Sequence, residues 1–182
     1  TSTAVMQLVE QGRLGIDDPV SMYIPEFSNV KVWANGVLEP PRRGITIRDL
    51  LRHTSGLAYD FSAPPELAPR YKDFFVNVRT LDEAGRKMAH LPLAEQPGTA
   101  FVYGLNTDVL GRVVEVVSEM GFESYLRENI FTPLSMTDTG FTPSSDLKAM
   151  QIVTPRDGQL VVDAAHYAHE GRILKPQFPS GG

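Results

Sequence analysis

The chain has 182 residues, with 17 lysines and arginines against 22 aspartates and glutamates, a formal charge of -5 and no cysteine. This acidic balance, without a cluster of basic residues, argues against nucleic acid as a partner, because phosphate binding needs a positive surface. No stretch approaches the ~20 apolar residues that a membrane span needs. The lack of cysteine excludes disulfides, thiolate metal sites and a cysteine nucleophile but leaves the compartment open. The length fits one globular domain, or part of one.

The first residues predict a helix that begins at or before Thr1. Its apolar positions have helical spacing: Ala4, Val5, Leu8 and Val9. Gly12 is the expected stop, and neither an initiator methionine nor a charged leader precedes this helix. At the other end, residues 178–182 have the composition of a loop that leads into a further element. We therefore expect residues 1–182 to be an interior, partial domain of a longer protein.

Two dipeptides predict β-hairpins. Asn35-Gly36 lies between segments rich in valine, and Asp157-Gly158 separates Ile152-Val153 from the apolar residues 160–162. Such pairs favour the tight turn with two positive φ angles that joins neighbouring antiparallel strands. The sequence therefore predicts one short hairpin near each of these turns.

Two helix starts can be located from capping patterns. Thr46 and Asp49 have the spacing of a capping box, in which a hydroxyl and a carboxylate exchange hydrogen bonds with backbone amides. Thr80 and Glu83 repeat this spacing. The helix that follows Thr80 is expected to end near His90, just before a proline.

The longest predicted helix carries apolar residues on one face. Asn106 or Thr107 is its expected cap and Gly121 its expected stop. A second helical pattern runs over residues 122–130 and ends at Pro133. Together with the hairpins, these helices predict an α+β fold.

A serine followed three residues later by lysine occurs twice, at Ser28 and Lys31 and at Ser145 and Lys148. A nucleophile of this kind needs the serine at the start of a buried helix, where the backbone dipole and the amine favour the alkoxide. Ser28 leads instead into a valine-rich segment, and Ser145 lies in a polar stretch. We interpret both pairs as chance matches.

His53 and Ser55 place an imidazole and a hydroxyl two residues apart. They could form a serine and base pair, but no Gly-x-Ser-x-Gly elbow occurs in the chain. A histidine and a glycine at a turn are also ordinary at the end of a helix, and we favour that structural interpretation.

One polar segment has the spacing of a metal site. Its candidate ligands are Asp163, His166, His169 and Glu170. A single histidine pair in a polar segment is more typical of a solvated surface, so we predict no metal here.

Tyr103 precedes the longest predicted helix by one turn. Its hydroxyl could project at a helix N-terminus, where a phenolate is stabilised and can act as a general base. The alternative is an amphipathic core tyrosine with one hydrogen bond, which spacing alone favours.

Several longer stretches carry a family resemblance. They are AVMQLVEQGRL at residues 4–14, ITIRDLLRHTSGL at 45–57, QPGTAFVY at 96–103, DVLGRVVE at 108–115 and FTPLSM at 131–136. Together they resemble the serine beta-lactamase-related hydrolases, the superfamily of class C beta-lactamases, D-alanyl-D-alanine carboxypeptidases and family VIII carboxylesterases. The similarity runs through nearly the whole chain, and the sequence looks most similar to the family VIII esterases.

The resemblance implies the beta-lactamase/transpeptidase-like fold and a Ser-x-x-Lys serine that forms an acyl-enzyme, with lysine and tyrosine moving the protons. That motif is expected upstream of Thr1. Tyr103 matches the family's tyrosine, so the resemblance reverses the preference above and assigns it as general base. Where many members have Tyr-x-Asn, this chain has Leu105 at the third position and Asn106 one later, and this substrate-binding pair favours the esterase branch. The third motif should follow residues 180–182, since His169-Glu170-Gly171 comes too early.

The implied activity is hydrolysis of short-chain carboxylic esters, with weak beta-lactam hydrolysis as a possible addition. A D,D-carboxypeptidase or beta-lactamase, and a non-catalytic binding protein on the same scaffold, remain open as alternatives. The implied partners are a small-molecule ester or beta-lactam, with no cofactor, no nucleic acid and no membrane span. Residues 1–182 alone should be inactive because the nucleophile lies outside them. The oligomeric state and the compartment stay open.

Overall fold

The computed structural model describes residues 1–72, 74, 78–141 and 153–162. In chain order the elements are α1 (Ser2–Glu10), the 3-10 helices η1 (Val20–Met22) and η2 (Pro25–Asn29), β1 (Val32–Ala34), β2 (Val37–Glu39), α2 (Ile47–Leu51), α3 (Ala68–Lys72), α4 (Leu81–Met88), α5 (Asn106–Ser118), α6 (Phe122–Leu126), the π-helical turn η3 (Arg127–Phe131), β3 (Val153–Arg156) and β4 (Gln159–Val162). Helices dominate the part of the chain that is described, and the strands are short.

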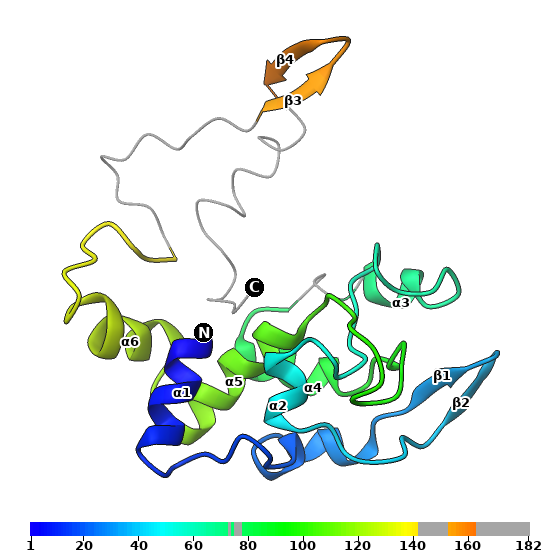
Figure 1. The fold of residues 1–182 in the computed structure, drawn as a ribbon, viewed down its shortest axis with the longest axis horizontal. Helices are drawn as coiled ribbons and strands as arrows, with labels where there is room; N and C mark the ends of the chain where they lie inside the picture. The colour runs from blue at the N-terminus through cyan, green and yellow to red at the C-terminus, as the bar shows by residue number, and fades with distance from the viewer. Residues whose placement is uncertain (73, 75–77, 142–152, 163–182) are drawn as a thin grey trace.

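Helix α5 is the centre of the helical packing. It contacts α1, α2, α4 and α6, which surround it in Figure 1. Its fully buried apolar residues have the predicted helical spacing: Val109, Leu110, Val113 and Val114. Because each such side chain contributes about 1.5–3 kcal/mol when removed from water, this face holds the surrounding helices together.

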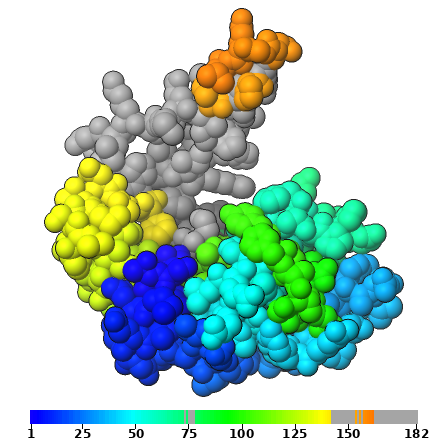
Figure 2. All heavy atoms as spheres, viewed as in Figure 1, coloured from blue at the N-terminus to red at the C-terminus, as the bar shows by residue number. Residues whose placement is uncertain are grey.

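Helix α1 confirms the prediction made from the first residues. Ala4, Val5 and Leu8 are buried, and Gly12 follows the helix with a positive φ of 69°. Gln7 donates from Nε2 to the backbone oxygen of Asn129 at 3.1 Å, which ties α1 to the segment after α6. In Figure 2 these two segments, blue and yellow, lie against each other on one face of the molecule.

Both predicted hairpins are confirmed, and both turns have two positive φ angles. Asn35 and Gly36 have φ of 48° and 92°, and β1 pairs with β2 in antiparallel register. Asp157 and Gly158 have φ of 49° and 75° between β3 and β4. Ile152, expected in the second hairpin, lies outside the described residues.

The start of α2 has the predicted capping box. The Thr46 hydroxyl accepts from the Asp49 amide at 3.2 Å, and the Asp49 carboxylate accepts from the Thr46 amide at 2.9 Å. At α4 the Thr80 hydroxyl accepts from the Glu83 amide at 3.1 Å, but the Glu83 carboxylate bonds the amide of Arg79 instead. The first box is therefore complete, and the second is half of one.

The predicted ends of α5 are wrong at both termini. The N-cap is Leu105, with no side-chain bond, and Asn106 is the first helical residue. The helix stops at Ser118 because Glu119 adopts a left-handed φ of 61°, and Gly121 instead precedes α6 as its N-cap. Helix α4 ends at Met88, in agreement with the predicted end near His90. None of the helices among the described residues is both long and apolar enough to span a membrane.

Candidate active site

Two loops that are distant in sequence fit together beside α5. After α2, His53 and Gly56 have positive φ angles of 54° and 89°, which turn the chain back on itself. Three backbone hydrogen bonds of 2.7–2.8 Å then join this loop to residues 94–102. Their donors and acceptors are Ala94 and Gly56, Gly98 and Thr54, and Val102 and His53. The residues that precede Tyr103 are therefore fixed against the loop that follows α2.

The close fit continues at Gly104. A side chain at this position would collide with the backbone of Leu57 and Ala58. Glycine allows such an approach because it has no Cβ. The step from Tyr103 into α5 is consequently pressed against the segment that follows the His53 loop.

Tyr103 lies at the surface of this junction, with half of its area exposed (50%). Its ring stacks on the His53 imidazole, with centroids 5.1 Å apart and planes 26° apart, and a tilted Tyr59 ring lies at 5.5 Å. The Ser62 hydroxyl donates to the Tyr103 backbone oxygen at 2.6 Å. The Tyr103 ring is thus held by contacts with the rings of His53 and Tyr59, while half of the residue stays accessible to solvent.

A polar network lies beneath Tyr103. The Ser55 hydroxyl donates to Oδ1 of Asn106 at 2.5 Å and accepts from the Leu57 amide at 3.0 Å. Asn106 Nδ2 lies 3.1 Å from His53 Nδ1. Ser55 and Asn106 are fully buried, so these bonds satisfy groups that water does not reach.

The electrostatics keep the side chains of His53 and Tyr59 neutral. Burial lowers the pKa of His53, which favours the uncharged ring near neutral pH. Burial and the nearby Asp108 carboxylate raise the pKa of Tyr59 far above its usual range. Tyr103 therefore sits between an uncharged imidazole and an uncharged phenol.

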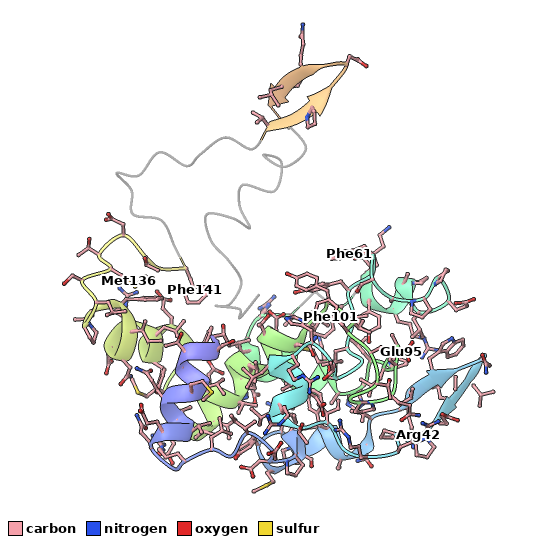
Figure 3. All side chains as sticks on the ribbon, in the orientation of Figure 1. Arg42, Phe61, Glu95, Phe101, Met136 and Phe141 are labelled. Carbon is pink, nitrogen blue, oxygen red and sulfur yellow. The ribbon has the colours of Figure 1, made fainter. Side chains whose placement is uncertain are left out.

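Further aromatic rings continue outward from Tyr103. Phe61 and Phe101 are 75% and 69% exposed and occupy the same edge of the molecule in Figure 3. Phe61 stacks on Tyr59 at 5.4 Å, and Phe101 lies 5.8 Å from the His53 ring. Phe61 therefore lies beside Tyr103, with centroids 6.4 Å apart, and Phe101 lies beside the His53 ring on which Tyr103 stacks.

The structure places the predicted substrate-binding pair in the interior. Leu105 is 1% and Asn106 0% exposed, and the Asn106 amide is directed at protein groups. Contact of Leu105 and Asn106 with a substrate stays a prediction. His53 and Ser55 do not form a nucleophile and base pair, because the Ser55 hydroxyl donates to Asn106 instead.

The remaining candidates lie away from this junction. Ser28 ends up on the exposed side of η2, and Lys31 is exposed as well. The second Ser-x-x-Lys pair and the candidate metal ligands lie outside the described residues: Ser145, Lys148, Asp163, His166, His169 and Glu170. Within the residues that are described, no group of three or more His, Asp or Glu side chains could hold a metal ion.

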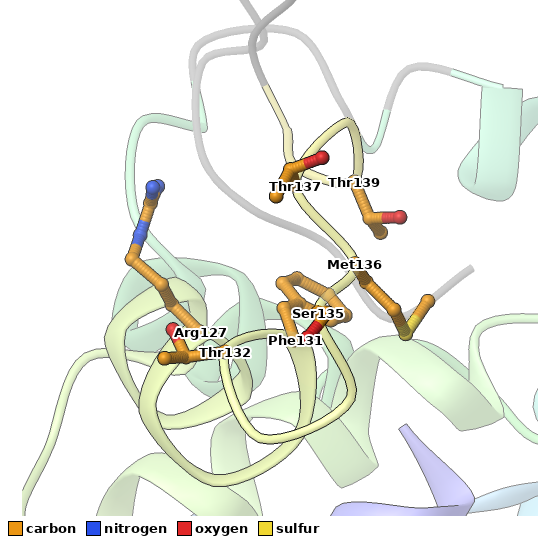
Figure 4. Close-up of a pocket in the computed structure, with 7 residues that line it drawn as sticks. All are labelled: Arg127, Phe131, Thr132, Ser135, Met136, Thr137 and Thr139. Carbon is orange, nitrogen blue, oxygen red and sulfur yellow. The ribbon is translucent and has the colours of Figure 1, made fainter.

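A separate pocket of about 300 Å³ lies over the turn after α6 (Figure 4). It is lined by Arg127, Phe131, Thr132, Ser135, Met136, Thr137 and Thr139. Its one basic group is already paired, since Arg127 donates to the Glu123 carboxylate at 2.5 Å. The hydroxyls in this pocket have no base beside them among these lining residues, so the junction at Tyr103 is the better candidate active site.

The sequence analysis considered His53 and Ser55 as a pair and Asn106 separately, and it missed that the three form one network. The available signal was the His-Thr-Ser-Gly turn together with an asparagine at the start of the long helix. Nothing in the local spacing joins them, because their hydrogen bonds span 51 and 53 residues.

Comparison with known proteins gives a consistent result. The family model described as Beta-lactamase matches residues 1–173. Protein Rv1367c of Mycobacterium tuberculosis is 38% identical over 151 residues, covering 80% of this chain and 37% of that protein. Lovastatin esterase of Penicillium rubens is 33% identical over 166 residues, covering 86% of this chain and 41% of that protein.

A solved structure extends the similarity to the fold. EstCE1, described as a hydrolase with promiscuous acyltransferase activity, aligns with a TM-score of 0.71 and 32% identity, covering 98% of this chain and 50% of its own. The alignment confirms the predicted beta-lactamase/transpeptidase-like fold. The chain spans half or less of the length of each of these relatives.

Proposed function

Because the chain belongs to the beta-lactamase family, we propose that the full-length protein is a serine hydrolase that cleaves short-chain carboxylic esters through an acyl-enzyme. The nucleophilic serine and its lysine belong to a Ser-x-x-Lys motif just upstream of Thr1, at the head of α1. Relatives described as an esterase and as a hydrolase support this class of reaction. Within this family, the proposal assigns the protein to the branch of the family VIII esterases.

The observation that carries the proposal is the position of Tyr103. Its ring is half exposed, lies on a buried polar network and precedes the central helix α5. A general base must reach the nucleophile while its own ring is held in place. Tyr103 is accessible from one side and held by ring contacts with His53 and Tyr59, and both properties support its role as the base.

In the proposed reaction Tyr103 carries the proton in both halves of the cycle. During acylation the serine oxygen bonds to the ester carbonyl carbon while its proton passes to the Tyr103 phenolate. The tetrahedral intermediate then breaks the ester C–O bond, and the leaving alkoxide takes the proton from Tyr103. During deacylation water attacks the acyl carbon, gives its proton to Tyr103, and the serine oxygen recovers that proton as the acyl bond breaks.

Acyl transfer to an alcohol is a second candidate function. EstCE1 is described as having promiscuous acyltransferase activity, and the same acyl-enzyme can be attacked by an alcohol in place of water. The exposed rings of Phe61 beside Tyr103 and of Phe101 beside His53 offer apolar surface for such an acceptor. Adding a primary alcohol during turnover and measuring ester formed against acid released would distinguish the two.

The proposal is tested by labelling and by one substitution in the full-length protein. A fluorophosphonate should add once, on a serine upstream of Thr1, as located by peptide fragmentation. Tyr103→Phe should lower kcat for p-nitrophenyl butyrate by ~100 to 10,000-fold, the usual size of a general-base effect. Tyr125→Phe is the matched control, since that buried hydroxyl has no partner among the described residues.

Other outcomes assign the alternatives. Near-normal activity of Tyr103→Phe would remove the general-base role. A folded wild-type protein that takes no label would indicate a non-catalytic scaffold. Faster acylation by a penicillin than by the butyrate ester would indicate a D,D-peptidase or a beta-lactamase.

A further inference from the structure

The structure assigns His53 as the residue that positions Tyr103, with Asn106 and Ser55 holding the imidazole from below. This role rests on the proposed function of Tyr103 and adds to it a chain of contacts from the protein interior to the catalytic ring. The contact between the two rings is a stack of 5.1 Å, so His53 acts through Tyr103 and does not exchange a proton with it.

The orientation of the Asn106 amide follows from its neighbours. The backbone oxygen of Val102 lies 3.5 Å from Nδ2, and a carbonyl can only accept a hydrogen bond. The Ser55 hydroxyl then donates to Oδ1 on the other side of the amide. With both ends fixed, Nδ2 donates to Nδ1 of His53, which must be the unprotonated ring nitrogen.

The imidazole therefore has one tautomer and one charge state in this arrangement. Its proton lies on Nε2, and a second proton on Nδ1 would face the Asn106 donor. Burial disfavours the charged ring as well. Tyr103 consequently stacks on a flat, neutral imidazole ring. The hydrogen bond from Asn106 blocks the rotation of this ring about the His53 Cβ–Cγ bond.

The backbone of His53 is fixed along with its side chain. Its carbonyl accepts from the Val102 amide at 2.8 Å, next to Tyr103, and the following Thr54 amide donates to Asp49 at 2.8 Å. A positive φ of 54° is uncommon for histidine, so tertiary contacts hold this conformation. Both partners of the ring stack are thus anchored to the same pair of loops.

Positioning has a kinetic consequence that differs from binding. A displacement of ~1 Å in a reacting group can cost on the order of 100-fold in rate. Loss of His53 should therefore lower kcat and leave KM within about three-fold, because substrate contacts of the other residues persist. The effect should also disappear when Tyr103 has no hydroxyl to position.

The test is a double-mutant cycle in the full-length protein with p-nitrophenyl butyrate and with fluorophosphonate labelling rates. His53→Asn removes the ring and keeps a residue type that tolerates a positive φ. It should lower kcat about 100-fold in the wild-type background and less than about three-fold in the Tyr103→Phe background. His90→Asn is the matched control, an exposed histidine just beyond α4.

Each outcome decides one point. Equal losses from His53→Asn in both backgrounds, or an unchanged kcat, would overturn the positioning role while leaving Tyr103 as the base. An active Tyr103→Phe protein would instead remove the proposed function itself. If His53→Asn does not give a cooperative thermal transition, His53→Gly, which also removes the ring and tolerates the positive φ, enters the same cycle with the same criterion of non-additivity.

Discussion

Helices α4 and α5 begin with residues of the same capping type but use them differently. At α4, Thr80 precedes the helix and its hydroxyl accepts from the Glu83 amide, three residues away. At α5, Asn106 is already inside the helix, and its amide bonds Ser55 and His53 of a distant loop. One polar side chain stabilises its own helix, and the other stabilises the support of Tyr103.

Helix α5 therefore has no side-chain cap at its N-terminus, because the Asn106 amide bonds the His53 loop. Leu105 is its N-cap and makes no side-chain bond to the first turn, although the residue that follows is among the best capping types. Helix α5 can lose this cap because four other helices pack around it. Helix α4 is shorter, and Thr80 caps its N-terminus with a local hydrogen bond.

The largest expected effect comes from breaking the network at α5. Asn106→Leu keeps the approximate volume but removes the acceptor of the Ser55 hydroxyl and the donor to His53 Nδ1, so we expect the free energy of unfolding of the full-length protein to fall by about 2–4 kcal/mol. Chemical denaturation measures this change. Asn129→Leu is the control, since that residue is half-buried and donates to the Tyr125 carbonyl at 3.0 Å. Equal losses for the two variants would contradict a special role of the α5 start.

A smaller effect is expected at α2, where the capping carboxylate is also an ion-pair partner. Asp49 is buried and accepts from Arg43 at 2.5 and 2.9 Å. Burial opposes its charge, but the hydrogen bonds from Arg43 and Thr46 outweigh it and hold the pKa of Asp49 below its usual value. Asp49→Asn should therefore lower the free energy of unfolding by about 1–3 kcal/mol at neutral pH.

The pH dependence of this loss follows from the direction of the shift. A depressed pKa in the folded state stabilises the fold fully above the unfolded pKa of ~3.9 and loses that contribution as the pH falls through the folded value. The difference between wild type and Asp49→Asn should thus be constant above about pH 5 and shrink below pH 4. Asp17→Asn, at an exposed pair with Arg48, should change less at every pH. A difference that grows on acidification would contradict the assignment.

The sequence was sufficient wherever the interacting groups are close in the chain. Both hairpin turns and the Thr46 cap were predicted because each depends on neighbours within three residues. The predicted start of α5 was wrong because the groups that interact there are distant in the chain. The hydrogen-bond partners of Asn106 lie 51 and 53 residues away. Rules based on local sequence cannot predict these contacts, so they favour Asn106 as an N-cap.

In the candidate site, Tyr103 was predicted from the sequence, but the contacts that hold its ring were not. Tyr103 was found from a family motif and from its place before a helix, and the structure puts its ring at the surface of the junction. Its support was not foreseen, because stacking on His53 requires two loops to meet at Gly104 and Gly56. The resemblance predicts Tyr103 as the reactive group, and the tertiary contacts that hold its ring became visible only in the fold.

The smallest expected effect is at the cap of α4, where the contact is local and exposed. Thr80→Ala should lower the free energy of unfolding by about 1 kcal/mol, because the Glu83 amide then loses its side-chain acceptor. Thr80→Ser keeps an acceptor oxygen and should change little. Since no contact links this cap to Tyr103 among the described residues, kcat should stay at the wild-type value in both variants. A fall in kcat with Thr80→Ala would show that α4 and α5 are coupled through their packing, and that the local cap also serves the site.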